Sequence, residues 1–182
     1  MGPGSVMDAT GQFEGFMRSY QNMVFTTAVR LVGNSTEAED IAQEVFLRAY
    51  ERFEYLQESP TAGGWLKTVT RNLCLNHLSR YQSRWKFFSD IFSRNEGGEV
   101  EVEFPDDADV AMNFETDEMR VKLEGALRRL PTAQRVPLVL FHVEELSYGQ
   151  IARQLGISQA KVKTDMFRGR EALRHMLQGD QA

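Results

Sequence analysis

Apolar residues in the first half of the chain recur at steps of three and four positions, which is the period of an α-helix. Gly33-Asn34, Ser59-Pro60 and Gly63-Gly64 interrupt the pattern and divide it into three stripes. Residues 36–39 (TEAE) have the spacing of a capping box and are predicted to begin the second helix. No stretch alternates with period two, so three long helices and no strand are predicted here. The stripes consist of Phe13, Phe16, Met17, Tyr20, Val24, Ala28 and Leu31; Ile41, Ala42, Val45, Phe46, Ala49 and Phe53; and Trp65, Leu66, Val69, Leu73, His77 and Tyr81.

The last third of the chain predicts a second group of helices. One helix ends at Pro131, and another runs through Val136 to Val143. Pro137 falls in the first turns of that second helix, where a missing N–H is best tolerated. The stripe of the first helix consists of Val121, Leu123, Leu127 and Leu130.

Residues 147–163 follow the pattern of a helix-turn-helix. Ser147 is placed to cap a short helix, Gly156 to make the tight turn and Ser158 to cap the next helix. The second helix of such a motif is the one that enters a DNA major groove. Charges on a helix are most often only solvated, but this motif context favours DNA binding. The second helix has an apolar stripe of Val162, Met166, Leu173 and Leu177, and its cations are Lys161, Lys163, Arg168, Arg170 and Arg174.

Charge is distributed unevenly along the 182 residues, whose net charge is −5. Basic and acidic side chains balance in residues 1–95, whereas residues 96–119 hold ten acids and no base. Residues 120–182 have a net charge of +5. The acidic stretch has too few large apolar residues to offset the entropy lost on ordering.

This distribution predicts an all-α protein made of two small helical modules. An N-terminal helix bundle, residues 6–95, is joined to a C-terminal helix-turn-helix module, residues 120–182. The acidic residues 96–119 form a flexible linker between them. Residues 1–5 (MGPGS) are interpreted as an expression scar.

The composition excludes several classes of protein. No apolar run approaches 18 residues, so membrane insertion is not expected, and the N-terminus has no secretory signal pattern. Cys74 is the only cysteine and cannot form an internal disulfide, and the three histidines have no metal-site spacing. No phosphate loop or nucleophile elbow is present, so no enzyme, cofactor or small-molecule substrate is predicted. A cytoplasmic protein is expected.

The third predicted helix interleaves cations with polar and aromatic side chains. This mixture suits single-stranded DNA, because phosphates need positive charge and unstacked bases need a flat or polar pocket. Trp65 is interpreted as a core residue, which is usual for an aromatic at helical spacing. His77 fits a core position and a DNA contact equally well. The candidate contacts are Lys67, Thr68, Arg71, Asn72, Asn76, Arg80, Arg84 and Lys86.

Several segments resemble bacterial sigma factors. Residues 38–50 (AEDIAQEVFLRAY) resemble the core-polymerase-binding helix of that family, and residues 64–72 (GWLKTVTRN) resemble its promoter-melting helix. The organisation of two modules joined by a short linker is similar to that of the extracytoplasmic-function (ECF, group IV) type of sigma factor. The resemblance covers about residues 12–88 and 120–177. Its C-terminal matches are Leu130-Pro131, Glu145-Leu146-Ser147-Tyr148 and Ile151-Ala152.

The resemblance implies a sigma factor that binds core RNA polymerase, recognises specific promoters and promotes DNA melting, under the control of an anti-sigma factor. The third helix would contact the melted minus-ten strand, with Asn72 near the pocket for a flipped base. The ridge implied to dock on the clamp helices of the largest polymerase subunit consists of Asp40, Gln43, Glu44 and Leu47. The residues implied to read the duplex minus-thirty-five element are Ser158, Gln159, Lys161, Lys163, Thr164, Arg168 and Arg170.

The recognition helix departs from the family pattern at three points. Residues 160–162 (AKV) replace the usual Gly-Thr-Val, and Asp165 replaces a basic or neutral residue. Gly169 replaces alanine, at a cost of about 1 kcal/mol in helix propensity. Because base choice depends on individual side chains, these positions bear on which promoter sequence is read.

Two other functions fit the same patterns. A helix-turn-helix transcriptional regulator would bind DNA without being a polymerase subunit, usually as a dimer on a palindrome. A helical adaptor protein would leave the basic helix merely solvated. Co-purification with core polymerase, together with initiation on specific promoters, distinguishes a sigma factor from both.

Overall fold

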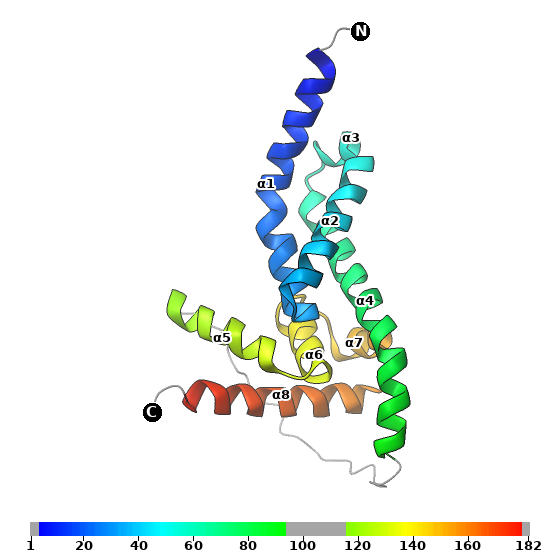
Figure 1. Ribbon diagram of the computed structural model, residues 1–182, viewed down its shortest axis with the longest axis vertical. Helices are drawn as coiled ribbons and strands as arrows, with labels where there is room; N and C mark the ends of the chain where they lie inside the picture. Colours follow the sequence, from blue (N-terminus) through cyan, green and yellow to red (C-terminus); the bar gives the residue numbers. More distant parts are fainter. Residues whose placement is uncertain (1–3, 94–115, 180–182) are drawn as a thin grey trace. The chain divides into compact units, whose positions relative to one another are not determined.

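The computed structural model describes the backbone of residues 4–93 and 116–179 and the side chains of residues 8–80 and 116–179. All elements in these ranges are α-helices, which confirms the all-α prediction (Figure 1). The chain divides into two compact units, Met1–His77 and Leu78–Ala182. The predicted linker, apart from its last four residues, lies outside the described residues. None of the described helices is long and apolar enough to span a membrane.

The described residues 4–93 form four helices: α1 (Gly4–Val32), α2 (Ser35–Glu51), α3 (Phe53–Leu56) and α4 (Ala62–Ser93). Helices α1 and α2 form an antiparallel pair (Figure 1). Gly33 makes the turn between them with a φ of 74°, a left-handed conformation that glycine adopts without steric cost. The short helix α3 was not among the three predicted.

The predicted capping box at residues 36–39 is wrong. Helix α2 begins at Ser35, and its N-cap is Asn34, which has an extended backbone. The Asn34 side-chain oxygen accepts a hydrogen bond from the Glu37 backbone N–H at 3.1 Å. Asparagine is among the best N-cap residues, so it fixes the helix start before Thr36.

The N-terminal core lies between α1, α2 and the first part of α4. Val24, Ala28 and Leu31 of α1 are fully buried, as are Val45 and Ala49 of α2. These positions belong to the predicted stripes, so the first two helices have the predicted inward faces.

On α4 the buried face is shifted by one residue from the predicted stripe. Leu66, Thr70 and Cys74 are fully buried, whereas Val69 and Leu73 are only half-buried. The Thr70 hydroxyl donates a hydrogen bond to the Leu66 carbonyl oxygen at 2.7 Å. Because this bond satisfies the hydroxyl, a polar residue occupies the core without an unpaired group.

The C-terminal unit contains α5 (Asp117–Arg129), α6 (Thr132–His142), α7 (Tyr148–Leu155) and α8 (Gln159–Gly179). Helix α8 contacts each of the other three. Pro137 lies in the second turn of α6, where it is buried without ending the helix. Val121 is a correction to the predicted stripe of α5, because its side chain is 69% exposed. The side chains that fill the core of this unit include Leu127, Leu138, Leu140, Ile151, Val162 and Met166.

Gly169 marks a close crossing of α6 and α8. A Cβ atom at this position would lie 2.7 Å from Leu138 Cδ1 and 3.3 Å from the Gln134 carbonyl oxygen. A side chain there would therefore push against α6. Gly169 lowers the helix propensity of α8, but its lack of a side chain allows α6 and α8 to pack closely.

The turn between α7 and α8 has the predicted local structure. Ser147 and Gln150 form a reciprocal capping box at the start of α7. Gly156 ends α7 with a φ of 66°, and Ser158 Oγ accepts a hydrogen bond from the Lys161 backbone N–H at 3.1 Å. Each serine therefore satisfies one of the amides that have no partner within the helix in the first turn of α7 or α8.

Candidate nucleic-acid and protein interfaces

The predicted ridge on α2 forms a continuous exposed face. Asp40, Gln43, Glu44 and Leu47 follow the spacing i, i+3, i+4, i+7, and all four are exposed. Glu44 accepts a hydrogen bond from Arg48 Nε at 2.9 Å, across one helical turn. Leu47 is 63% exposed, and it is one of the residues that line an open groove between α1 and α2.

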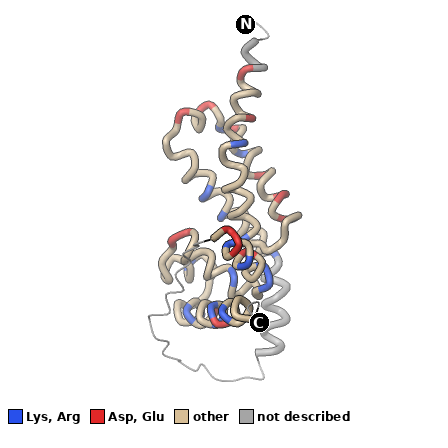
Figure 2. The backbone as a smooth tube through the Cα atoms, turned by 90° about the vertical axis from the view of Figure 1, so that its left-hand side faces the viewer, with Lys and Arg blue, Asp and Glu red and all other residues tan. Residues whose placement is uncertain are grey.

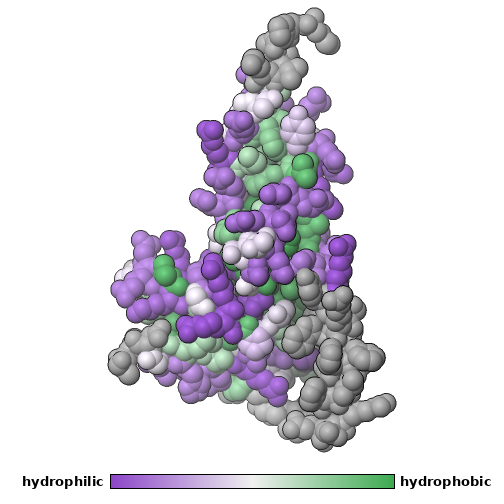
Figure 3. Space-filling view, in the orientation of Figure 1, coloured by the Kyte–Doolittle hydropathy of each residue, from purple (hydrophilic) through white to green (hydrophobic). Residues whose placement is uncertain are grey.

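Beside the ridge, α1 and α2 enclose an open groove of about 890 Å³. Its walls are mainly apolar, and carboxylates of Glu14 and Glu39 lie among the lining residues. Figure 3 shows hydrophobic surface over this pair of helices, flanked by hydrophilic side chains. Sequence reasoning missed the α1 wall of this groove. The apolar side chains that line the whole groove include Phe13, Met17 and Phe25 of α1 and Phe46, Leu47 and Tyr50 of α2.

Aromatic contacts join α1 to α2 and α3 beside the groove. Phe13 meets Tyr50 edge-on, with ring centroids 5.0 Å apart and an interplanar angle of 80°. Phe13 also meets Phe53 of α3 at 5.1 Å. Such pairs add about 0.5–1.5 kcal/mol beyond simple burial. Even so, Tyr50 remains 59% exposed, so its ring forms part of the available surface.

Four of the candidate residues on α4 form an exposed stripe. Thr68, Asn72, Asn76 and Arg80 are spaced four residues apart and are all exposed. Lys67 and Arg71 lie beside them and are half-buried. The stripe therefore presents hydroxyl, amide and guanidinium groups together. The side chains of the two other candidates, Arg84 and Lys86, lie outside the described residues.

Trp65 and His77 lie on the half-buried border of α4. His77 Nε2 lies 3.1 Å from Glu37 Oε2 on α2, a distance at which a protonated imidazole forms an ion pair with the carboxylate. This contact joins α4 to α2. It favours a structural role for His77 over a DNA contact.

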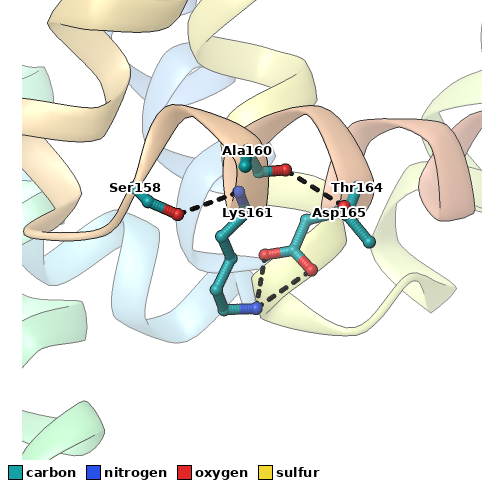
Figure 4. Close-up of polar contacts among 5 residues, drawn as sticks. All are labelled: Ser158, Ala160, Lys161, Thr164 and Asp165. Atoms are coloured by element: carbon teal, nitrogen blue, oxygen red, sulfur yellow. Dashed lines mark hydrogen bonds and ion pairs between the residues drawn. The ribbon is translucent and has the colours of Figure 1, made fainter. Parts of the chain in front are cut away.

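On α8, some of the candidate side chains are exposed and others are half-buried. Thr164 is half-buried, and its hydroxyl donates to the Ala160 carbonyl oxygen at 3.0 Å (Figure 4). Arg170 is also half-buried. The exposed candidates are Ser158, Gln159, Lys161, Lys163 and Arg168.

Most cations of α8 have a partner within the C-terminal unit. Basic positions recur along this helix, which ends near the C label in Figure 2. Lys163 Nζ lies 5.5 Å from the centroid of the Tyr148 ring, and Arg170 NH2 lies 3.3 Å from His142 Nε2. Arg168 is exposed and has no polar partner among the described residues.

Lys161 forms an ion pair with Asp165, and Arg174 forms one with Glu171. Lys161 Nζ lies 2.9 Å and 3.1 Å from the two carboxylate oxygens of Asp165 (Figure 4). Sequence reasoning recognised Asp165 only as a departure from the family. The four-residue spacing was a readable signal for the pair, but the burial of Asp165 was not.

The Tyr148 ring is itself fixed by packing. It stacks on Phe141 of α6 with ring centroids 4.9 Å apart and an interplanar angle of 16°. Lys163 therefore rests over an aromatic surface that two helices build.

Among the residues that the structure describes, no three His, Cys, Asp or Glu side chains are grouped as a metal site.

Comparisons with known proteins assign families to both parts of the chain. Residues 16–84 match the model of Sigma-70 region 2, and residues 120–173 match that of Sigma-70 region 4. The ECF RNA polymerase sigma factor SigE of Mycolicibacterium smegmatis is 31% identical over 95% of this chain and 66% of its own length. SigW of Bacillus subtilis, also an ECF RNA polymerase sigma factor, is 30% identical over 87% of this chain and 84% of its own length.

A solved structure is also similar to this chain. It is the sigma factor RpoE from Bartonella quintana, crystallised in complex with the anti-sigma factor NepR. The sequences are 22% identical, the match covers 91% of this chain and 96% of that chain, and the TM-score is 0.49.

Proposed function

The chain belongs to the ECF family of RNA polymerase sigma factors, and from this premise we propose how its helices divide the work of transcription initiation. It binds core RNA polymerase, recognises two promoter elements and promotes melting of the DNA between them. We assign it to the group IV type, with residues 6–95 as the region-two module and residues 120–182 as the region-four module. Residues 96–119 serve as the linker.

The observation that carries the proposal is the exposed ridge on α2. An ordinary helix-turn-helix regulator has no need for Asp40, Gln43, Glu44 and Leu47 on one solvent-facing side of a helix. Acidic and amide groups beside an exposed leucine fit a basic, partly apolar helical partner. We assign this partner as the clamp helices of the polymerase largest subunit. The groove beside the ridge gives apolar side chains of such a partner a place to bind.

The stripe on α4 is assigned to the minus-ten element. Exposed amides at Asn72 and Asn76 hydrogen-bond the edges of unstacked bases, and Arg80 attracts the backbone phosphates. Melting follows when these contacts bind the single strand in preference to the duplex. The further residues assigned to this element are Lys67, Thr68, Arg71, Arg84 and Lys86.

Helix α8 is assigned to the duplex minus-thirty-five element. Its first turns carry the exposed side chains, and the N-terminal part of a recognition helix is the part that meets base edges. The residues assigned here are Ser158, Gln159, Lys163, Thr164, Arg168 and Arg170. Lys161 lies on the same helix, but its ammonium is paired with Asp165.

The roles assigned to α2, α4 and α8 require no covalent chemistry in this chain, because nucleotide addition belongs to the polymerase. Accordingly, we propose no cofactor and no small-molecule substrate. We also propose an anti-sigma factor as a regulatory partner and the cytoplasm as the site of action.

Transcription in vitro tests the proposal. Core RNA polymerase is mixed with the full chain and a pool of promoter fragments, and the transcripts are sequenced. A sigma factor yields transcripts that start at a defined distance from two shared sequence elements. If the chain binds DNA but leaves core polymerase inactive, it is a conventional regulator. Binding to neither DNA nor polymerase would favour the adaptor alternative.

A further inference from the structure

Asp165 is a buried acid on a helix assigned to read DNA. The residue is only 5% exposed, and its side chain packs on the inner side of α8. Figure 4 shows Lys161 and Asp165 on the same side of the helix, with the lysine ammonium directed at both carboxylate oxygens. Lys161 is the only polar partner of this carboxylate in the described part of the chain.

This geometry commits the Lys161 ammonium to the protein. A buried carboxylate is unfavourable unless it is paired, and removing its partner leaves an uncompensated charge. The side chain of Lys161 is 55% exposed, so its stem lies at the surface while its charged end points along the helix toward Asp165. If the Lys161 ammonium turned away toward a DNA phosphate, Asp165 would lose the only polar partner that it has among the described residues.

The neighbouring cations are held differently. Lys163 rests over the Tyr148 ring, which orients the ammonium without cancelling its charge. Arg168 is exposed and has no polar partner among the described residues. Along one helix, the charge of Lys161 is therefore neutralised, whereas those of Lys163 and Arg168 remain available to DNA.

We propose that Asp165 is a positioning residue that withdraws Lys161 from phosphate contact and thereby sets how strictly α8 reads its DNA. Contacts to phosphates carry no sequence information and raise the affinity for all DNA alike. Removing one such contact lowers nonspecific binding while leaving base contacts in place. The proposal rests on the assignment of α8 to the minus-thirty-five element.

The salt dependence of DNA binding tests this role, because each phosphate contact changes the slope of log K against log salt by about 0.9. The full chain, assembled with core polymerase, is titrated with a duplex that contains the upstream element. Lys161→Gln removes the charge but keeps an amide donor for the carboxylate. We expect its slope to equal that of the unaltered chain. Asp165→Asn releases Lys161, and we expect a slope steeper by about 0.9 together with stronger nonspecific binding.

The double variant K161Q/D165N identifies the residue that makes the new contact. Its slope returns to that of the unaltered chain if the added contact comes from Lys161. Arg168→Gln is the matched control, and it makes the slope shallower by about 0.9 whether residue 165 is Asp or Asn. Circular dichroism confirms that each variant keeps its helices. Should D165N fail to fold, the slope of K161Q alone decides the matter.

A K161Q slope shallower by about 0.9 overturns the proposal, because Lys161 would then already contact a phosphate. A folded D165N variant with an unchanged slope overturns it as well. In both cases, a shallower slope for Arg168→Gln would still support the assignment of α8 to DNA binding. If Arg168→Gln also leaves binding unchanged, α8 does not contact the element, and the assigned function of this helix fails together with the inference.

Discussion

Helices α2 and α8 both present charged side chains to solvent, but they differ in what lies around those charges. On α2, the acids stand beside Leu47 and Tyr50, which are 63% and 59% exposed. On α8, by contrast, Lys161, Lys163 and Arg170 each contact a side chain of their own unit. The face of α2 leaves apolar side chains exposed to solvent, whereas most cations of α8 contact side chains of their own unit.

The difference indicates two ways of obtaining affinity. Covering Leu47 alone contributes about 1–2 kcal/mol through removal of apolar surface from water. Burial of this kind is non-directional and suits contact with the apolar surface of a protein partner. Side chains that are already positioned lose less conformational entropy on binding, and they discriminate between ligands by geometry. Such an arrangement suits a helix that compares many DNA sequences.

The largest expected effect comes from reversing charge on the open surface of α2. The double variant D40K/E44K should weaken binding to core polymerase by about 3 kcal/mol, or more than about 100-fold, because like charges would meet across the interface. Affinity is measured by titrating labelled protein with core enzyme. The unfolding midpoint should change little, since both side chains are exposed.

Glu54→Lys combined with Glu58→Lys is the matched control. Both residues are exposed in the same unit, and neither lines the groove. This pair of changes has the same effect on net charge and should leave the affinity near its original value. Equal losses in the two double variants would mean that α2 supplies only a diffuse electrostatic field and that the ridge is no specific contact.

A second large effect should come from filling the crossing of α6 and α8. Gly169→Leu inserts a side chain where even a Cβ atom would lie 2.7 Å from Leu138 Cδ1. We expect a loss of about 1–3 kcal/mol in the free energy of unfolding, because overpacking forces both helices to shift. Denaturant unfolding measures this loss.

Gly125→Leu is the control for glycine replacement in a helix. Gly125 is exposed on α5, and a Cβ atom there would have no neighbour within 4 Å. Its replacement should stabilise the protein by about 0.5–1 kcal/mol through helix propensity. Similar stabilisation from Gly169→Leu would show that α6 does not hold α8 in place. It would also weaken the view that α8 is supported by its own unit more than α2 is.

The inward faces of α1 and α2 were predictable from apolar periodicity, because most of their core positions are apolar and Thr27 is the one buried polar residue on the two helices in the described part of the chain. The register of α4 was not, because its buried face includes Thr70 and Cys74. The Thr70 hydroxyl is satisfied by the backbone of its own helix, a contact that hydropathy does not record. Val121 was assigned to the core from its side chain alone. It lies two residues before Leu123 and so points away from the buried face.

The candidate surfaces show a similar division. Exposure of the ridge on α2 was predictable, because polar residues and a leucine at helical spacing lie opposite the aliphatic stripe. The partners of the α8 cations were not, since Tyr148 and His142 reach them from other helices. Contacts between distant residues depend on tertiary packing, and a single sequence gives no direct sign of them.

A smaller effect is expected from the N-cap of α7, the helix that precedes α8 and contacts it. Ser147→Ala removes the side-chain oxygen that accepts from the Gln150 backbone N–H at 3.2 Å. Loss of an N-cap of this type costs about 1 kcal/mol. Denaturant unfolding should register this loss, and DNA binding by α8 should weaken in parallel. The control, Ser35→Ala on α2, replaces an exposed serine that does not cap its helix, and should be nearly neutral. Equal effects would contradict the importance of the capping box.

The smallest effect concerns Lys163 and separates a positioned cation from a solvated one. A double-mutant cycle with Lys163→Met and Tyr148→Leu isolates the coupling between the ammonium and the ring, which we expect to be about 0.5–1 kcal/mol. The Glu44–Arg48 pair on α2 provides the comparison, because both of its side chains are about half exposed. Its cycle should give about 0.3–0.5 kcal/mol, which salt reduces.

Salt should distinguish the two cycles further. The Glu44–Arg48 attraction joins two solvated charges and weakens as the ionic strength rises. The Lys163–Tyr148 contact joins a charge to a ring that stacks on Phe141, so more of its energy should persist in high salt. Tyr148→Phe retains the ring and should retain the coupling. If the coupling at Lys163 is no larger than that at Arg48 and disappears with salt, Lys163 is as freely solvated as the charges on α2. Internal positioning of the α8 cations would then rest on Lys161, Arg170 and Arg174.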